Sequence, residues 1–333
     1  MNLTEENQEE SCVHSNFSCL RTSATAADVL LYLSVAVVVT VTVCGNLLVI
    51  ISICHFKNLQ TPTNFLLLSL AMADFLVGVI VMPLYFTIMI DPKRCFGTVV
   101  CTIFNIATFH LTCVSIYNVS LIAVDRCLAL SNPFHYSMKM TVNLTLKIVT
   151  ILWMCSLIYN LVLLYFNVNI TNMKVNITCS ECVVIVNKVW AIVDFILVFL
   201  IPCSMIIVIY LKIFAIAKRH ASKIRSVRKC QKTNIGSVVS EKKAAKTLGV
   251  LVAVFLLCLV PFYVSAFLDG YISNRSVQLA VSVTLTILYL NSSINPIIYA
   301  LFYPWFQRSV KLIFTLKICG TESSVLNVLE QEP

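Results

Sequence analysis

The chain has 333 residues, of which 59% are hydrophobic and only 12% are charged, and its net charge is +9. A soluble domain is closer to half apolar and a quarter charged, and a soluble chain with this composition would expose a large apolar surface. The composition therefore argues against a cytosolic enzyme, a nucleic-acid-binding protein and a disordered protein, and it favours a chain that lies in lipid.

Residues 1–26 form a polar tail that contains four glutamates and lacks the basic segment and early apolar run of a cleavable signal peptide. We expect this tail to be extracellular and the first apolar segment to serve as the insertion signal. Seven apolar segments follow, each long enough for a helix to cross a membrane, which takes about 20 residues. These segments are 27–54, 62–88, 98–131, 144–166, 186–217, 243–268 and 276–302.

The seven segments are expected to be helices because backbone groups in hydrocarbon must be paired within the protein. The strands of a membrane barrel would be about ten residues long and would alternate in polarity, which these segments do not. No internal repeat is visible, which argues against transporters built from inverted repeats. The predicted fold class is an all-α membrane protein, a bundle of seven transmembrane helices over residues 27–302.

Residues 303–316 follow the last apolar segment and are predicted to form an interfacial eighth helix. Trp305 and Phe306 would be buried, and Arg308 and Lys311 would lie at the lipid headgroups. Residues 317–333 would form a cytoplasmic tail. Cys319 in this tail is a candidate for palmitoylation, or it remains a free cysteine.

Basic residues determine the expected orientation, since cytoplasmic loops are rich in Lys and Arg. With the N-terminus outside, 18 of the 24 basic residues lie on the cytoplasmic side, and 11 of them fall within 212–246 beside a single acid, Glu241. This run is interpreted as a topology signal beside anionic lipid, as a docking surface for a cytosolic partner, or as both. We expect a multi-pass protein of the plasma membrane.

The segments expected outside the cell contain six of the 15 cysteines, in an oxidising compartment where disulfides form. Six cysteines allow 15 full pairings, so spacing alone does not choose among them. Glycosylation motifs also fall on this side, whereas that of Asn143 faces the cytosol. The outer motifs begin at Asn2, Asn16, Asn169, Asn176 and Asn274.

Acids inside a membrane span are costly and are therefore candidates for function. Only three lie within the spans away from their outer edge: Asp74, Asp125 and Asp194. Asp74 is either a cation or water site or a structural polar residue, and Asp125 with Arg126 is either a functional pair or an interfacial anchor. Asp194 lies eight residues before Pro202, about 12 Å along the helix, one to two turns below the outer end of the fifth span.

An unpaired carboxylate at the depth of Asp194 would cost several kcal/mol or take up a proton. Apart from Lys188 at the outer edge of the fifth segment, no Lys or Arg lies in the outer half of a span to neutralise it. A cationic ligand that arrives from outside would remove the penalty. The alternative is a carboxyl group that is hydrogen-bonded to Ser, Thr or Tyr.

The motifs along the chain, taken in order, resemble those of the rhodopsin-like (class A) G-protein-coupled receptors. They include Gly45–Asn46, Asp125–Arg126–Cys127, Trp153, and the segment NPIIY at 295–299. Within that class the chain is similar to the trace amine-associated receptors, above all in NSSINPIIYALFYPWF at 291–306. The resemblance implies an olfactory receptor, like those of fish, that binds small protonated amines and activates a stimulatory heterotrimeric G protein. It implies no enzymatic activity.

The resemblance also implies roles for particular residues. The ligand would meet Asp194 and an aromatic and hydroxyl wall made of Thr108, Phe109, Thr112, Phe262, Tyr263 and Tyr289. Activation would involve Asp125, Arg126, Tyr210, Pro261, Asn295, Pro296 and Tyr299. An allosteric sodium ion, the one cofactor considered, would be held by Asp74, Ser115, Asn291 and Asn295.

We expect a disulfide between Cys101 and Cys182, and by resemblance a second one between Cys12 and Cys179, for which Cys19 competes with Cys12. The chain departs from amine receptors at Thr108, where an Asp is usual. Leu259 replaces the usual Trp of the sixth span, and Cys127 replaces the usual Tyr.

Other function classes stay open. A small transporter or channel would need polar groups along a through-path, which three acids at different depths do not supply. An intramembrane metalloenzyme is disfavoured because the histidines lack ligand spacing, and His110, the one histidine within a span, is expected to pack or to line the pocket. A receptor of the same fold for a neutral or peptide ligand is the main alternative, because Thr108 replaces the usual counter-ion.

Overall fold

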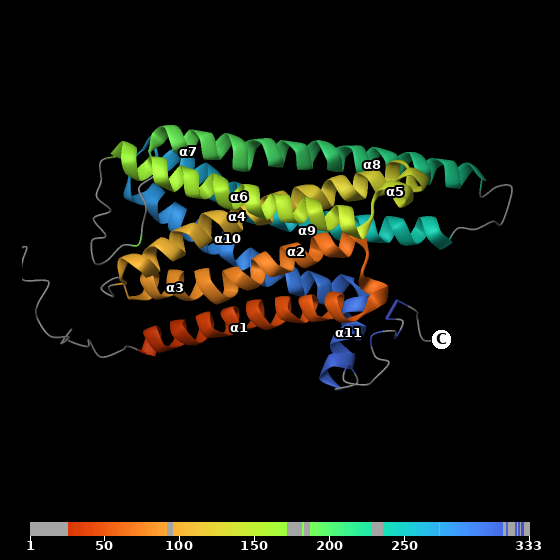
Figure 1. Cartoon of the computed structure of the whole chain (residues 1–333), viewed down its shortest axis with the longest axis horizontal. Coiled ribbons are helices and arrows are strands. Elements are labelled where there is room, and N and C mark those ends of the chain that lie inside the picture. The colour runs from red at the N-terminus through yellow and green to blue at the C-terminus, as the bar shows by residue number, and fades with distance from the viewer. Residues whose placement is uncertain are drawn as a thin grey trace, which may run out of the picture.

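The computed structural model describes residues 26–91, 96–171, 182, 187–227, 236–272 and 274–315, with five single positions in the C-terminal tail. Long helices lie side by side along the long axis of the molecule (Figure 1). In chain order they are α1 (Ala26–His55), α2 (Pro62–Leu76), η3 (Val77–Val81), α3 (Met82–Ile90), α4 (Thr98–Ser131), α5 (Pro133–Lys139), α6 (Val142–Thr171), α7 (Lys188–Asp194), η4 (Phe195–Leu200), α8 (Ile201–Val227), α9 (Gly236–Asp269), α10 (Arg275–Phe302) and α11 (Pro304–Phe314), with a short 3₁₀ turn η2 (Lys57–Leu59).

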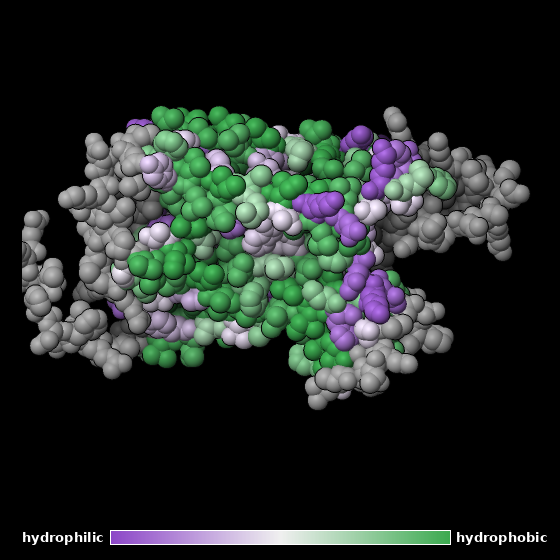
Figure 2. Space-filling view, viewed as in Figure 1, coloured by the Kyte–Doolittle hydropathy of each residue, from purple (hydrophilic) through white to green (hydrophobic). Residues whose placement is uncertain are grey.

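Seven spans in the described part of the chain are long and apolar enough to cross a membrane, which confirms the predicted seven-helix bundle. The second span joins α2, η3 and α3, and the fifth joins α7, η4 and α8. In each case a π-helical segment continues the helix rather than breaking it. Figure 2 shows a broad hydrophobic surface over the helices and a band of hydrophilic residues near the end that carries α5 and α11.

Gly45 and Asn46 fix the close approach of α1 to α10. A Cβ atom added to Gly45 would lie 2.7 Å from Cβ of Pro296, so only glycine fits at this crossing. The Asn46 side chain donates a hydrogen bond to the Ser292 carbonyl at 3.0 Å and another to the Thr42 carbonyl at 2.9 Å. These contacts place the part of α10 that faces Asp74.

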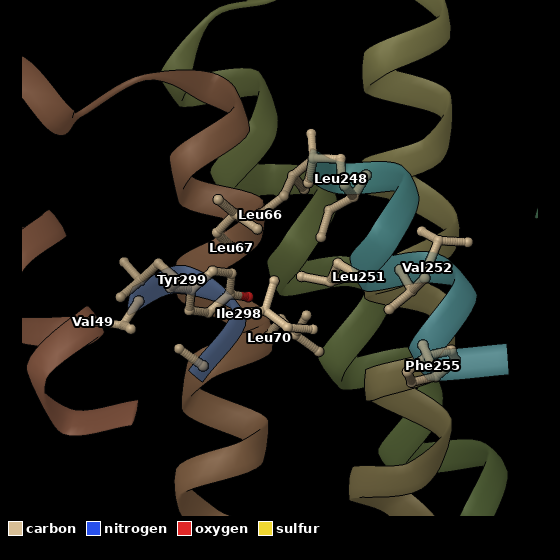
Figure 3. Packing of buried hydrophobic residues seen from close by; sticks show 14 of the residues in the cluster. Val49, Leu66, Leu67, Leu70, Leu248, Leu251, Val252, Phe255, Ile298 and Tyr299 are labelled. Atoms are coloured by element: carbon tan, nitrogen blue, oxygen red, sulfur yellow. The ribbon is translucent and has the colours of Figure 1, made fainter. Parts of the chain in front are cut away.

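A buried apolar cluster fills one half of the bundle. Leu67, Leu70, Leu251, Phe255 and Tyr299, each at most 2% exposed, join α2, α9 and α10. Figure 3 shows the Tyr299 ring extending from α10 towards the leucines of α2. A second cluster lies in the other half and contains the cysteines of the disulfide. Buried carboxylates therefore lie in a helix bundle whose buried residues are mostly apolar.

Two short helices lie outside the spans. In α11, Trp305 and Phe306 are buried and Lys311 is exposed, as predicted for an interfacial helix. Arg308 instead donates a hydrogen bond to the Val328 carbonyl of the tail at 3.1 Å. The sequence analysis missed α5, although the Asn132 side chain caps it and proline occupies its first position.

Candidate functional site

Asp194 is the last residue of α7 and immediately precedes the π-helical segment η4. Its side chain is partly buried, and its Oδ1 accepts a hydrogen bond from the Tyr159 hydroxyl of α6 at 3.2 Å. No Lys or Arg side chain forms an ion pair with it in the described part of the chain. Among the described residues the carboxylate therefore has a single donor, where it could accept several.

The π-helical segment explains how Asp194 reaches Tyr159. A π turn holds one residue more than an α turn, so the helix after the turn is rotated about its axis relative to the helix before it. Such turns are frequent at functional sites. The Tyr117 hydroxyl of α4 donates to the Leu197 carbonyl within η4 at 2.9 Å. Tyr117 and Tyr159 together fix the fifth span beside Asp194.

Aromatic side chains form a wall beside Asp194. Phe199 of η4 stacks on Tyr263 of α9 with ring centroids 4.6 Å apart, and Phe262 meets Tyr263 edge-on at 5.4 Å. Tyr263 is close enough to Asp194 for the carboxylate charge to act on its phenol. Phe195 packs on Phe267 at 4.7 Å. The structure thus brings Phe262 against Tyr263, and Tyr263 within range of the Asp194 charge.

The other predicted wall residues divide into two groups. The Thr108 hydroxyl faces that of Tyr289, and both oxygens are buried without a hydrogen bond of normal geometry within the described residues. Thr112 and Tyr289 line a small cavity that also contains Asp74. Phe109 is partly buried, and the described contacts do not join it to either group. Tyr289 thus lies between the outer residues and the inner polar cluster.

Asp74 is 1% exposed, and both of its oxygens are paired. Ser292 donates to Oδ1 and Asn295 Nδ2 donates to Oδ2, each at 2.7 Å. The cavity beside Asp74 has a volume of about 20 Å³, and Ser115 and Asn291 line it. A cavity of this size holds about one water molecule or one ion of similar size.

The donor set around Asp74 fits a sodium ion. Hard cations prefer oxygen ligands, and Asp74, Ser115 and Asn291 supply a carboxylate, a hydroxyl and an amide oxygen. Oδ1 of Asn291, which lines the cavity, is buried and has no hydrogen-bond partner within the described residues. A cation in this cavity would satisfy this unpaired oxygen. Asn295, the fourth predicted ligand, does not line the cavity and instead donates to Asp74.

Asp125 at the end of α4 forms a polar cluster rather than a simple interfacial anchor. It is 2% exposed and pairs with Arg126 at 2.5 Å. The Thr63 hydroxyl donates to Oδ2, and the Tyr136 hydroxyl donates to Oδ1, each at 2.7 Å. Arg126 also contacts Thr63. Burial and the bond to Asp125 raise the pKa of Tyr136, which keeps it a donor.

Three tyrosines lie near this cluster. The hydroxyls of Tyr210, Tyr299 and Tyr303 are buried and have no partner within the described residues. Tyr210 and Tyr303 are close enough to Arg126 for its charge to act on their phenols, and Tyr299 meets Tyr303 edge-on with ring centroids 5.7 Å apart. Pro261 and Pro296 lie inside α9 and α10. Arg126 thus lies near two phenol hydroxyls that the described contacts do not use.

The expected disulfide between Cys101 and Cys182 is present, with the two Cα atoms 5.0 Å apart. It ties α4 to the segment before α7. The second predicted pair, Cys12 and Cys179, its competitor Cys19, and Cys319 lie outside the described residues, as do Asn2, Asn16 and Asn176. Asn169 lies in α6, and its side chain is not described. Asn274 caps α10, where its side chain accepts from the amide of Ser276.

The family model of the seven-transmembrane receptors of the rhodopsin family matches residues 45–299. The chain is 38% identical to trace amine-associated receptor 13c of Danio rerio, an alignment that covers 94% of each chain. The chain belongs to the trace amine-associated receptors. It is 36% identical to receptor 7f of Mus musculus over 99% of this chain and 92% of that one. The proteins of this family are receptors and not enzymes, as expected for this chain.

Sequence reasoning missed the partners of its own candidates. Tyr159, Thr63 and Tyr136 bind the carboxylates of Asp194 and Asp125, yet none lies next to them in the sequence. His110 follows the predicted packing role, since it contacts Trp153 and bonds to Ser156 at 3.0 Å. Tyrosines within apolar spans were a usable signal, because a buried hydroxyl needs a partner.

Proposed function

We propose that this receptor binds small protonated amines, with the ammonium group paired to Asp194. The observation that carries the proposal is a partly buried carboxylate that has one protein donor, Tyr159, and no basic partner among the described residues. An ammonium group would donate to the free positions of the carboxylate. The charge pair would be strengthened by the low dielectric of the bundle.

The aromatic wall supports the same ligand class. Tyr263 lies within range of the carboxylate charge and Phe262 packs against Tyr263, and a desolvated cation over an aromatic face gains up to about 2 kcal/mol. The unpaired hydroxyls of Thr108 and Tyr289 would serve a second polar group of the ligand or a water molecule. Thr108 itself carries no charge, so the counter-ion role falls to the fifth span.

The signalling step would be a population shift between two arrangements of the bundle. In the arrangement seen here Arg126 is held by Asp125 and Thr63. We infer that agonist binding releases Arg126, which then meets the Gα subunit while Tyr210 and Tyr299 support the open state. Sodium at Asp74 would favour the closed arrangement.

The cellular setting is part of the proposal. The receptor would lie in the plasma membrane with its N-terminus outside, because basic residues concentrate in the segments placed inside. It would activate a stimulatory G protein and raise cAMP in olfactory neurons. The relatives are named for trace amines, which supports the proposed class of ligand.

The test is Asp194→Asn in cells that report cAMP, with a panel of monoamines, diamines and uncharged isosteres. We expect the amine EC50 to rise about 100-fold or more, since losing a buried charge partner costs about 3–5 kcal/mol. Asp91→Asn is the matched control, as Asp91 is an acid that follows the last residue of α3. An unchanged amine response in a variant that reaches the cell surface would refute the site, and activation by the uncharged isosteres would favour a neutral ligand.

A further inference from the structure

A second, larger cavity lies between the third, fourth and fifth spans. Its volume is about 310 Å³, and its walls include Cys113 and Tyr117 of α4, Cys155 and Tyr159 of α6, and Leu197 of η4. This volume is at the lower end of the range for small-molecule sites, about 300–1,000 Å³. None of the seven residues predicted to bind the amine lines this cavity.

The cavity opens towards the lipid. Cys155 is exposed and Leu197 is 42% exposed, although both line it. Around its mouth on α6, Ile151, Met154 and Ile158 are each more than half exposed. Exposed apolar side chains on a membrane span face the acyl chains. A ligand would therefore enter from the bilayer and not from the water outside.

The chemistry of the walls selects an uncharged ligand. The Tyr159 hydroxyl donates to Asp194, the Tyr117 hydroxyl donates to the Leu197 carbonyl, and the Ser156 hydroxyl bonds to His110. The two tyrosine protons are thus committed, but each phenol oxygen retains lone pairs that accept hydrogen bonds. No charged side chain lines the cavity, and a charge brought there would lack a partner in hydrocarbon.

We propose that this cavity is a second binding site, which takes small lipophilic alcohols or phenols from the bilayer, and that its occupation weakens the response to amines. The regulatory effect on the amine response rests on the proposed function. The ligand would place an apolar body against the wall and donate its hydroxyl proton to a tyrosine oxygen.

The coupling to the amine site runs through two hydrogen bonds. Tyr159 joins the cavity wall to the Asp194 carboxylate, and Tyr117 joins it to the π turn that orients Asp194. A molecule in the cavity holds both tyrosines, and with them the π turn, in the positions that they have in the present arrangement of the bundle. The cavity is present while Arg126 is paired with Asp125, and a ligand shifts a receptor towards the state that it binds.

Filling the cavity with protein should mimic the ligand. Cys155→Phe adds a ring to the wall, whereas Leu161→Phe adds one at an exposed position of α6 that does not line the cavity. We expect the amine EC50 to rise about tenfold in Cys155→Phe, within the usual range of allosteric coupling, and to stay unchanged in Leu161→Phe. Equal effects of the two variants at equal surface expression would overturn the regulatory role.

Binding can be tested without an amine, on the purified receptor. Benzyl methanethiosulfonate modifies exposed thiols, and mass spectrometry follows the rate at Cys155 and at exposed Cys44 of α1 in one molecule. Thymol, a small uncharged phenol, should slow labelling of Cys155 several-fold and leave Cys44 unchanged. Equal rates with and without thymol, or equal slowing at both cysteines, would overturn the site.

The two experiments separate the two proposals. If no amine activates the receptor, the proposed function fails, while protection of Cys155 by thymol still supports the site. If amines act through Asp194 and thymol protects neither cysteine, the cavity proposal fails alone. Protection of Cys155 with no effect of thymol on the amine EC50 of the native receptor would support the site and overturn its regulatory role.

Discussion

The carboxylates of Asp74 and Asp194 lie in the same bundle but in opposite surroundings. Asp74 is 1% exposed, and each of its oxygens accepts a bond of 2.7 Å from α10. Asp194 is partly buried and has one bond of 3.2 Å from Tyr159. A carboxylate with both oxygens paired holds two helices together, whereas one with a single weak donor retains the capacity to bind something else. The number of donors separates a structural or switching acid from a ligand-binding acid more clearly than burial does.

The two acids should differ most in how far their replacement by alanine destabilises the folded receptor. Asp74→Ala leaves the side chains of Ser292 and Asn295 buried without their acceptor, which costs about 1–3 kcal/mol for each. Asp194→Ala leaves only the Tyr159 hydroxyl, close to a cavity. Thermal unfolding of the purified receptors should show a clearly larger loss for Asp74→Ala. A larger loss for Asp194→Ala would reverse our assignment of the two roles.

Gly45→Ala should disturb the Asp74 region without changing a polar group. The new Cβ would meet the rigid ring of Pro296, next to Asn295, and overpacking of this kind costs about 1–3 kcal/mol. We expect a lower unfolding temperature and an amine EC50 that stays near that of the native receptor. Gly97→Ala is the control, because open space surrounds that position. Equal stability of the two variants would contradict the close packing of α1 on α10.

Tyr159→Phe tests whether the single donor orients Asp194. The variant retains the ring and removes the bond of 3.2 Å, and we expect the amine EC50 to rise about tenfold, the equivalent of about 1.4 kcal/mol. Tyr165→Phe is the matched control, since Tyr165 is 66% exposed on the same helix. If the two variants respond alike, Tyr159 has no positioning role.

The smallest expected effect is that of sodium. Replacing sodium by potassium in the buffer should change agonist affinity about fivefold in the native receptor, and this dependence should vanish in Asp74→Asn. Radioligand binding at constant ionic strength measures it. A sodium effect that persists in Asp74→Asn would place the ion elsewhere, and no effect in either receptor would leave only water beside Asp74.

The sequence was sufficient for the architecture and for the identity of the acids. Long apolar segments that do not alternate in polarity can cross a membrane only as helices. Charged groups inside them are rare, so Asp74, Asp125 and Asp194 are found at once. Asn295 and Arg126 were expected beside Asp74 and Asp125. The tyrosine partners could not be predicted, because Tyr159 and Tyr136 reach Asp194 and Asp125 through the relative rotation of helices far apart in the chain. The predicted amine wall likewise divides at Tyr289, since Thr112 lines the cavity beside Asp74.

The π turn of the fifth span has a consequence for how such a receptor could diversify. Asp194 precedes η4 and Tyr210 follows it, so the two ends of one helix are set at independent angles. Deleting a single residue within 195–200 would turn the outer end by about 100° and leave the inner end where it is. Insertions and deletions in this turn can thus change which ligands are recognised outside the cell, while the residues at the inner end of the helix keep their positions.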